Sequence, residues 1–193
     1  MTQFEFLMTF ASVVLAIALT EIFGGWGKLA RSRRPIRWSV LWVGWSMVIV
    51  GLIMMYWSGI WPYRTASFSE GYRVAWLVIP TFLLVVLCFL FSPEPGSDEG
   101  EVDLAERYWQ IAPRAFPVLA LFMIASRIAD HVISGIGPFG PEPPSIVLFV
   151  LPVSLVLVVA CALSRRVWLH FVTLASFAAV VVVFLFASTG IFE

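Results

Sequence analysis

The chain has 193 residues, of which 61% are hydrophobic and only 12% are charged, and its formal net charge is zero. A soluble domain is about 45–50% apolar and about 25% charged. With a mean hydropathy of +0.95, the composition favours a lipid environment and argues against an ordinary soluble domain. A zero net charge gives no overall attraction to nucleic acid, so we expect no nucleic-acid partner.

Six segments are long and apolar enough to be membrane-spanning helices, each of which needs about 20 predominantly apolar residues. Backbone groups in lipid must bond within their own helix, and the short alternating strands of a membrane barrel do not occur here. We therefore predict an all-α integral membrane protein, a compact six-helix bundle forming a single domain over residues 1–193. The expected helices cover residues 4–23, 38–61, 74–91, 115–135, 145–163 and 167–191.

The predicted loops are short except for an acidic one at residues 92–114. Gly24 and Gly25 are expected to end the first helix. Within the acidic loop, residues 102–111 have the pattern of a short amphipathic helix at the membrane interface. The N-terminal segment lacks a basic leader and carries Glu5, so we expect the first helix to be retained rather than cleaved.

Lysine and arginine predict the orientation of the bundle. The first, third and fifth loops hold nine of them, whereas the second and fourth hold two, Arg64 and Arg73. Loops rich in Lys and Arg face the cytoplasm. This asymmetry predicts both termini outside, in a bacterial-type inner or plasma membrane. The nine residues are Lys28, Arg31, Arg33, Arg34, Arg37, Arg107, Arg114, Arg165 and Arg166.

The fourth predicted helix carries Ser126, Arg127, Asp130 and His131 inside its apolar span. Arg127, Asp130 and His131 are spaced i, i+3 and i+4, so they share one helix face. A helix over residues 115–135 would place Arg127 near the membrane midplane, where a charge costs roughly 2.5–3.5 kcal/mol on insertion scales. Such a cluster favours a polar pathway or a proton relay. Two alternatives stay open: an ion pair that only locks the bundle, or a shifted helix that leaves Asp130 and His131 at the outer interface.

Two further ionisable residues lie in the predicted inner half of the membrane. Glu21 either gates the cytoplasmic mouth of a pathway or forms a salt bridge with Arg114 or the basic first loop. His170, one turn into the sixth helix, is a secondary candidate that amphipathic decoration of the interface explains equally well. We do not expect His131 and His170 to share a metal ion, because they lie toward opposite membrane faces.

Small residues recur at heptad spacing on the second helix, at Gly44, Gly51 and Ser58. Such stripes allow helices to approach closely, and packing within the chain is the simpler interpretation than an oligomer interface. Cys88 and Cys161 lie in apolar runs without a C-x-x-C motif, so they indicate packing rather than a disulfide or a metal site. We expect no cofactor.

The sequence lacks the common hydrolase, metalloprotease and phosphate-loop motifs, so we do not expect an enzyme. The hypothesis it favours is a small channel or transporter, homo-oligomeric in the lipid bilayer, for an ion or small polar solute. Arg127, Asp130 and His131 would line or gate the path, with Glu21 at its inner mouth. The alternatives are a non-transporting accessory or scaffold subunit of a larger membrane complex, and a sensor whose acidic loop binds a cytosolic partner.

Overall fold

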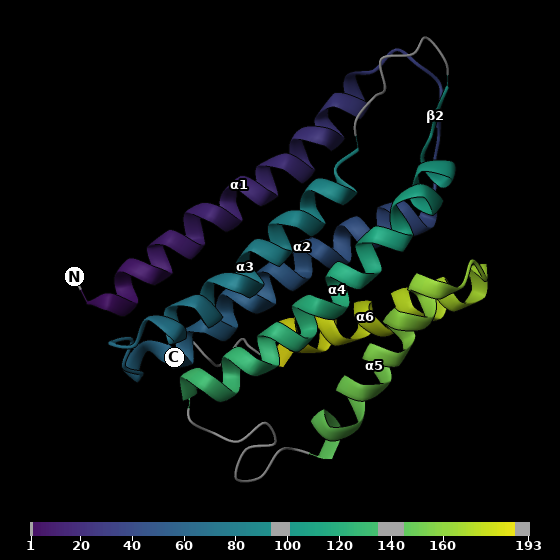
Figure 1. Cartoon of the computed structure of the whole chain (residues 1–193). Helices are drawn as coiled ribbons and strands as arrows, with labels where there is room; N and C mark the ends of the chain where they lie inside the picture. The colour runs from purple at the N-terminus through teal and green to yellow at the C-terminus, as the bar shows by residue number, and fades with distance from the viewer. Residues whose placement is uncertain (1, 94–100, 135–144, 188–193) are drawn as a thin grey trace.

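The computed structural model describes residues 2–93, 101–134 and 145–187, and these ranges are mostly helical. Six α-helices are joined by one 3₁₀ helix and two very short strands (Figure 1). In chain order the elements are α1 (Gln3–Arg31), β1 (Ile36–Arg37), α2 (Val40–Ile60), η1 (Trp61–Thr65), α3 (Gly71–Phe91), β2 (Val102–Asp103), α4 (Leu104–Ser134), α5 (Ser145–Leu163) and α6 (Val167–Ala187).

Five of these helices are long and apolar enough to cross a membrane: α1, α2 with η1, α3, α4 and α6. In α5 the corresponding apolar stretch of described residues is shorter, Val150–Leu163. A bundle of six apolar helices agrees with the prediction from the sequence. Residues 188–191, which were predicted to complete the sixth helix, lie outside the described residues.

Polar side chains cap the starts of three helices. Thr2 and Glu5 form a reciprocal capping box at α1, with the Thr2 amide donating to Glu5 Oε2 over 2.7 Å. The Ser39 hydroxyl accepts a hydrogen bond from the Trp42 amide at α2. Asp103 Oδ1 accepts from the amides of Ala105 and Glu106 at α4, at 2.8 and 2.9 Å. These oxygens satisfy amides that have no partner within the helix.

The predicted end of the first helix near Phe23 is wrong, because α1 continues through its glycines to Arg31. The glycine at position 25 has a packing role instead of a terminating one. A Cβ atom there would lie 2.6 Å from Ser92 Oγ and 2.7 Å from Pro93 Cδ. The missing side chain therefore lets the end of α3 pass directly against α1.

The predicted loop at residues 92–114 is also wrong over its second half, although the helix expected at residues 102–111 is confirmed from Leu104 onward. That helix is not a separate one, because α4 begins at Leu104 rather than at Ala115 and includes all eleven residues 104–114. The Asp103 cap fixes this start, and the buried side chains of Leu104, Tyr108 and Ala112 attach the extra turns to the core. The helix had been bounded by its apolar run, but a helix can extend beyond the hydrocarbon of the membrane.

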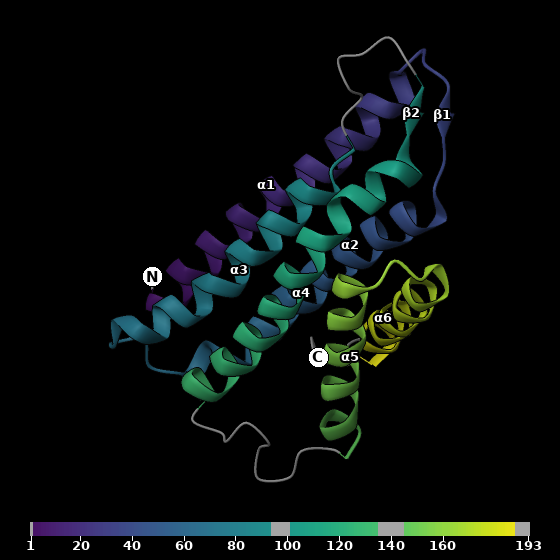
Figure 2. The same ribbon diagram turned by 45° about the vertical axis from the view of Figure 1, so that its right-hand side comes forward.

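The first four α-helices form one bundle, and α5 and α6 lie as a pair against it (Figures 1 and 2). Within the bundle α3 packs between α1 and α4, whereas α5 contacts α4 and α6 contacts α2. The main core is aromatic: Trp45 meets Phe116 at 5.1 Å and Phe177 at 5.5 Å between ring centroids. A smaller core joins Phe4, Leu7, Ala11, Ile60, Phe68, Leu77, Ala129 and Ile133.

The stripe of small residues on α2 receives α6. A Cβ atom on Gly44 would lie 2.6 Å from Leu174 Cδ2, and one on Gly51 would lie 2.4 Å from Val181 Cγ1. Gly44 and Gly51 thus allow close packing within the chain, which was the simpler of the two interpretations of the stripe. Ser58 completes the spacing, and its hydroxyl donates to the Met54 carbonyl of its own helix.

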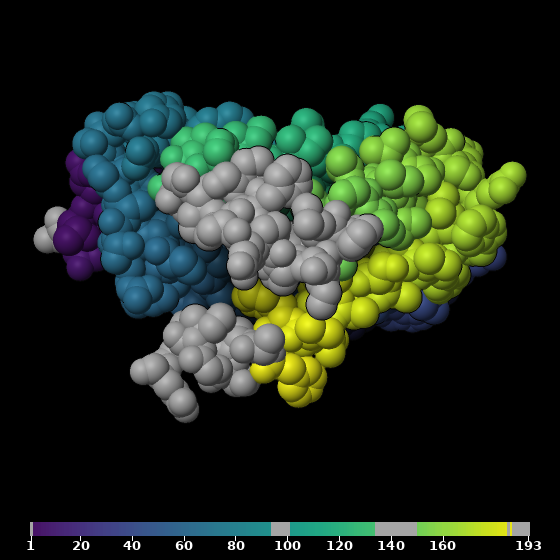
Figure 3. Space-filling model, turned by 90° about the horizontal axis from the view of Figure 1, so that it is seen from below, coloured from purple at the N-terminus to yellow at the C-terminus, as the bar shows by residue number. Residues whose placement is uncertain are grey.

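Consecutive helices run in opposite directions, which gives the bundle two ends. We call the end with β1, β2 and residues 164–166 the basic end, and the end with η1 the η1 end (Figure 2). Figure 3 looks from below and shows the green residues of α4 beside the blue residues of η1 and α3, with α5 and α6 to the other side.

Candidate functional site

The Arg127, Asp130 and His131 cluster lies in the last two turns of α4, at the η1 end. Because α4 ends at Ser134, Asp130 is only four residues, or about 6 Å of helix rise, from that end. The smaller core at this end includes Ala129 and Ile133, the neighbours of the cluster on α4. The cluster therefore lies near the end of a long helix. The predicted helix over residues 115–135 had instead placed Arg127 near its middle.

Arg127 and Asp130 form an ion pair, with Arg127 Nη1 2.9 Å from Asp130 Oδ2. The Tyr63 hydroxyl of η1 donates a hydrogen bond to the other oxygen, Asp130 Oδ1. Both carboxylate oxygens are thus engaged, and the bond to Tyr63 fastens α4 to η1. The side chains are 31% exposed at Arg127 and 45% at Asp130. An ion pair at i, i+3 was one of the alternatives that the sequence left open, whereas Tyr63 was not among the candidates.

A second polar network adjoins this pair, on α2 and α3. The Tyr56 hydroxyl donates to the Leu77 carbonyl over 2.7 Å and lies 3.2 Å from Thr81 Oγ1, which is fully buried. Pro80 interrupts the backbone bonding of α3 at this point, because proline has no amide hydrogen. The two hydroxyls give additional hydrogen bonds to the backbone beside the proline. The network therefore stabilises an interrupted helix, and the sequence prediction had missed it.

Ser126 and His131 are the other two residues of the predicted cluster on α4. His131 is exposed and lines a cleft between α4 and α5 of about 270 Å³. The buried Ser126 hydroxyl has no hydrogen-bond partner among the residues that the structure describes. The cleft is lined by Met123, Ile124, Arg127, Ile128, His131, Leu151 and Leu155. The surface of the cleft is almost entirely apolar, so Arg127 and His131 line it with carbon atoms rather than with their nitrogen atoms.

The second site lies toward the basic end and is centred on His170, which is completely buried. His170 Nδ1 is 2.6 Å from the Tyr108 hydroxyl of α4, and Nε2 is 2.8 Å from the Ser164 carbonyl. A carbonyl only accepts, so Nε2 carries the hydrogen, and in neutral His170 the Tyr108 hydroxyl donates to Nδ1. The sequence had suggested an interfacial histidine. Burial beneath Trp109 and Phe116, with ring centroids at 4.7 and 5.3 Å, makes it a core residue.

Glu21 is paired differently from the prediction. The Ser92 hydroxyl lies 3.0 Å from both the Glu21 carbonyl and Glu21 Oε1. The proposed partner Arg114 is exposed on α4, and His170 bonds to Tyr108 instead. Glu21 thus joins α1 to the end of α3, directly beside the close contact at Gly25. This contact could not be read from the sequence, because Ser92 is 71 positions away.

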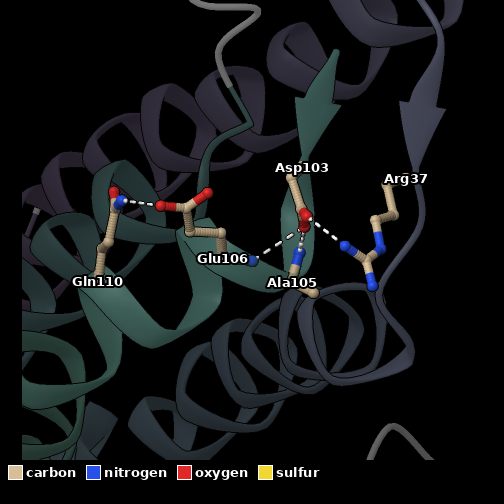
Figure 4. A network of polar contacts seen from close by, with 5 residues as sticks. All are labelled: Arg37, Asp103, Ala105, Glu106 and Gln110. Atoms are coloured by element: carbon tan, nitrogen blue, oxygen red, sulfur yellow. Dashed lines mark hydrogen bonds and ion pairs between the residues drawn. The ribbon is translucent and has the colours of Figure 1, made fainter.

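The basic end is closed by a short parallel pairing of β1 with β2 (Figure 4). Arg37 Nη1 lies 3.0 Å from Asp103 Oδ2, while Asp103 Oδ1 caps α4. The backbone amides of Glu106 and Ala105, assisted by the Arg37 guanidinium, hold the pKa of Asp103 below its usual value. One carboxylate therefore ties the first loop to the start of α4.

The described residues were also compared with the arrangements that metal ions and reactive cysteines require. Within residues 2–93, 101–134 and 145–187, no group of three His, Cys, Asp or Glu side chains is placed to hold a metal ion. Cys88 and Cys161 are both buried and free, and Cys161 Sγ lies 3.2 Å from Thr173 Oγ1. No protein-family model matches the chain, and neither a curated protein nor a solved structure is significantly similar to it.

Proposed function

We propose that the protein is a non-transporting accessory or scaffold subunit of a larger membrane complex. The observation that carries this proposal is that Arg127, Asp130 and Tyr63 contact one another. The charges that suggested a transport path compensate one another and fasten η1 to α4. A paired charge costs much less in a membrane than an isolated one. Packing within the chain is thus sufficient reason for the cluster.

The packing between the two polar sites supports the same proposal. Tyr56 meets Phe122 at 5.8 Å, and Trp45 meets Phe116 at 5.1 Å between ring centroids. These four aromatic side chains occupy the interior between Asp130 at the η1 end and His170 toward the basic end. A relay between the two sites would have to cross this apolar region. Each polar site instead connects neighbouring helices locally.

The proposed setting is a bacterial-type inner or plasma membrane with the basic end in the cytoplasm. The nine Lys and Arg residues that the sequence assigned to the first, third and fifth loops belong to this end of the bundle. They lie in the last turn of α1 (Lys28 and Arg31), in the first half of α4 (Arg107 and Arg114) and in the segments that follow α1 and α5. The positive-inside rule then puts both termini outside. Labelling of single cysteines placed at Ser32 and at Ser69 tests this orientation, because only Ser69 would react with an impermeant reagent in intact cells.

Purification of the tagged full chain from its native host in a mild detergent tests the subunit proposal. We expect a stoichiometric heteromeric partner, and we expect the double variant Arg127→Met with Asp130→Leu to keep it. Replacing both members of an ion pair by apolar side chains leaves no uncompensated charge, even where the pair is partly exposed as here, whereas removing one charge leaves the other uncompensated. A homogeneous self-oligomer with no partner, together with an ion flux that the double variant abolishes, would overturn the proposal.

The second candidate is a homo-oligomeric channel or transporter for an ion or small polar solute. The polar side chains near the end of α4 favour it, since His131 is exposed and Arg127 and Asp130 are 31% and 45% exposed. Glu21 would then serve the cytoplasmic mouth, where it is hydrogen bonded to Ser92. In proteoliposomes, an Asp130→Asn change should alter flux on this account. Unchanged flux in a correctly folded Asp130→Asn protein would remove the candidate.

A further inference from the structure

Three exposed arginines lie at the basic end, where the turn between α5 and α6 packs against α4. They are Arg114 on α4 and Arg165 and Arg166 in the turn, and we call them the arginine corner. Arg165 and Pro113 line the same small cavity of about 80 Å³, so the turn adjoins the part of α4 that carries Arg114. We propose that the arginine corner binds the headgroup phosphate of an anionic phospholipid. This inference rests on the membrane setting proposed above, and not on the choice between subunit and transporter.

The arginine corner carries positive charge that no carboxylate of the described chain balances. Within residues 2–93, 101–134 and 145–187, none of its three guanidinium groups forms an ion pair. By contrast, Arg37 at the same end is paired with Asp103 over 3.0 Å. Each guanidinium has five N–H donors, so the corner has donors for the oxygens of a phosphate. Basic sites between transmembrane helices on the cytoplasmic side bind anionic headgroups in this way.

The buried His170 holds the turn that carries two of these arginines. His170 Nε2 donates to the Ser164 carbonyl over 2.8 Å, and the Ser164 hydroxyl accepts from the Arg166 amide over 3.3 Å. The Arg166 carbonyl in turn accepts from the Leu169 amide over 3.0 Å, at the start of α6. The backbone of the turn is thus attached to the core while its arginine side chains are exposed. A fixed backbone lowers the entropy that is lost when these side chains bind a ligand.

Exposed apolar side chains flank the two arginines of the turn along the chain. Leu163 before them is 85% exposed, and Val167 and Trp168 after them are 51% and 60% exposed. Tryptophan in the first turn of a membrane helix is typical of the level of the headgroups. A phospholipid brings a negative phosphate and apolar chains to the same place, whereas an acidic protein segment would leave these apolar side chains in water. The combination therefore favours a lipid as the occupant.

Native mass spectrometry of the full chain tests the proposal with lipids of matched acyl chains. The protein is released from nanodiscs that contain equal amounts of phosphatidylglycerol and phosphatidylcholine, and we expect the wild type to retain phosphatidylglycerol preferentially. The double variant Arg165→Gln with Arg166→Gln keeps side chains of similar size and removes two charges. Since each basic side chain near an anionic surface contributes about a fivefold effect, we expect the preference to fall by about five- to 25-fold.

The double variant Lys28→Gln with Arg33→Gln is the matched control. It removes the same charge from the same end of the bundle, at two exposed residues in and just after the last turn of α1. α1 packs against α3 and α2, whereas α5 and α6 lie apart from it (Figures 1 and 2). We therefore expect this control to keep the wild-type preference for phosphatidylglycerol.

Three results would overturn the proposal. They are equal retention of the two lipids by the wild type, the wild-type preference in a folded Arg165→Gln with Arg166→Gln protein, and an equal loss in both double variants. The last result would show a general attraction of lipid to the basic end instead of a site at the arginine corner. Cysteine labelling at Ser32 and Ser69 tests the membrane setting separately, so failure of the setting and failure of the lipid site are distinguishable.

Discussion

The contact between Gly51 and Val181 gives a sharp test of how α6 is held. A Cβ atom at position 51 would lie 2.4 Å from Val181 Cγ1, 3.2 Å from Cγ2 and 3.4 Å from Cβ. Valine in a helix has one strongly preferred rotamer, so turning Cγ1 of Val181 away from position 51 has an energy cost of its own. The Gly51→Ala change must therefore be accommodated by an unfavourable Val181 rotamer or by separating α2 from α6.

The size of the effect follows from two opposing contributions. Overpacking of a close contact costs about 1–3 kcal/mol, while alanine is about 1 kcal/mol more favourable than glycine in a helix interior. We expect Gly51→Ala to lower the free energy of unfolding by about 0–2 kcal/mol. Gly44→Ala should cost less, because the nearest atoms there are the terminal methyl groups of Leu174.

Gly59→Ala is the matched control on the same helix. Among residues 2–93, 101–134 and 145–187, no atom beyond the nearby backbone of α2 and the adjacent residues lies within 4 Å of a Cβ built at position 59. Gly59→Ala therefore keeps the gain in helix propensity, which is smaller near the helix end, without the clash. Unfolding in mixed micelles with rising dodecyl sulfate, followed by circular dichroism, measures all three variants. If Gly51→Ala is as stable as Gly59→Ala, α6 does not pack in the groove on α2 and the reasoning is wrong.

Three further predictions concern the polar contacts. Tyr63→Phe removes the hydrogen bond to Asp130 and should lower the free energy of unfolding in the same assay by about 1.5–3 kcal/mol, the usual range for a bond to a charged group; no change would show that the bond contributes nothing. Tyr108→Phe leaves His170 Nδ1 without its donor and should cost about 1–3 kcal/mol. Nitrogen NMR of the wild type should show His170 with its hydrogen on Nε2, and a hydrogen on Nδ1 instead would contradict the geometry. The contacts of Asp103 lower its pKa in the folded state. Their contribution to the free energy of unfolding is therefore present above the usual carboxyl pKa and is lost as the pH falls through the lowered pKa. In unfolding measured as a function of pH, Asp103→Asn should abolish this loss of stability in acid.

The helices could be predicted from the sequence because an apolar run of about 20 residues can satisfy its backbone hydrogen bonds in lipid in few structures other than a helix. Their ends were harder to predict, since apolarity alone does not set them. α1 passes Gly24 and ends at Arg31, and α4 begins at Leu104 under the cap of Asp103. Capping hydrogen bonds and tertiary contacts decide where these helices begin and end. A capping residue can be recognised in the sequence only once the position of its helix is known.

In the candidate site, contacts between residues close in the sequence could be predicted, whereas contacts between distant residues could not. The pairing of Arg127 with Asp130 follows from an i, i+3 spacing and was foreseen. Tyr63 is 67 positions from Asp130, and Tyr108 is 62 positions from His170. Which tyrosine meets which partner depends on how the helices are arranged, and nothing in either tyrosine's neighbourhood indicates it. Glu21 was given the wrong partner for the same reason.

The length of α4 gives a physical reason for its ion pair. Between Arg114 and Arg127 the helix has twelve residues without a formal charge, which rise about 18 Å, whereas the hydrocarbon core is about 30 Å thick. Arg114 is exposed toward the basic end, so the missing length must come from the turns after Ser126. Compensation of Arg127 by Asp130 and Tyr63 makes those turns compatible with lipid, extending the span to Ile133, about 28 Å of rise. On this reasoning the cluster is what would allow α4 to cross the membrane that we propose as its setting.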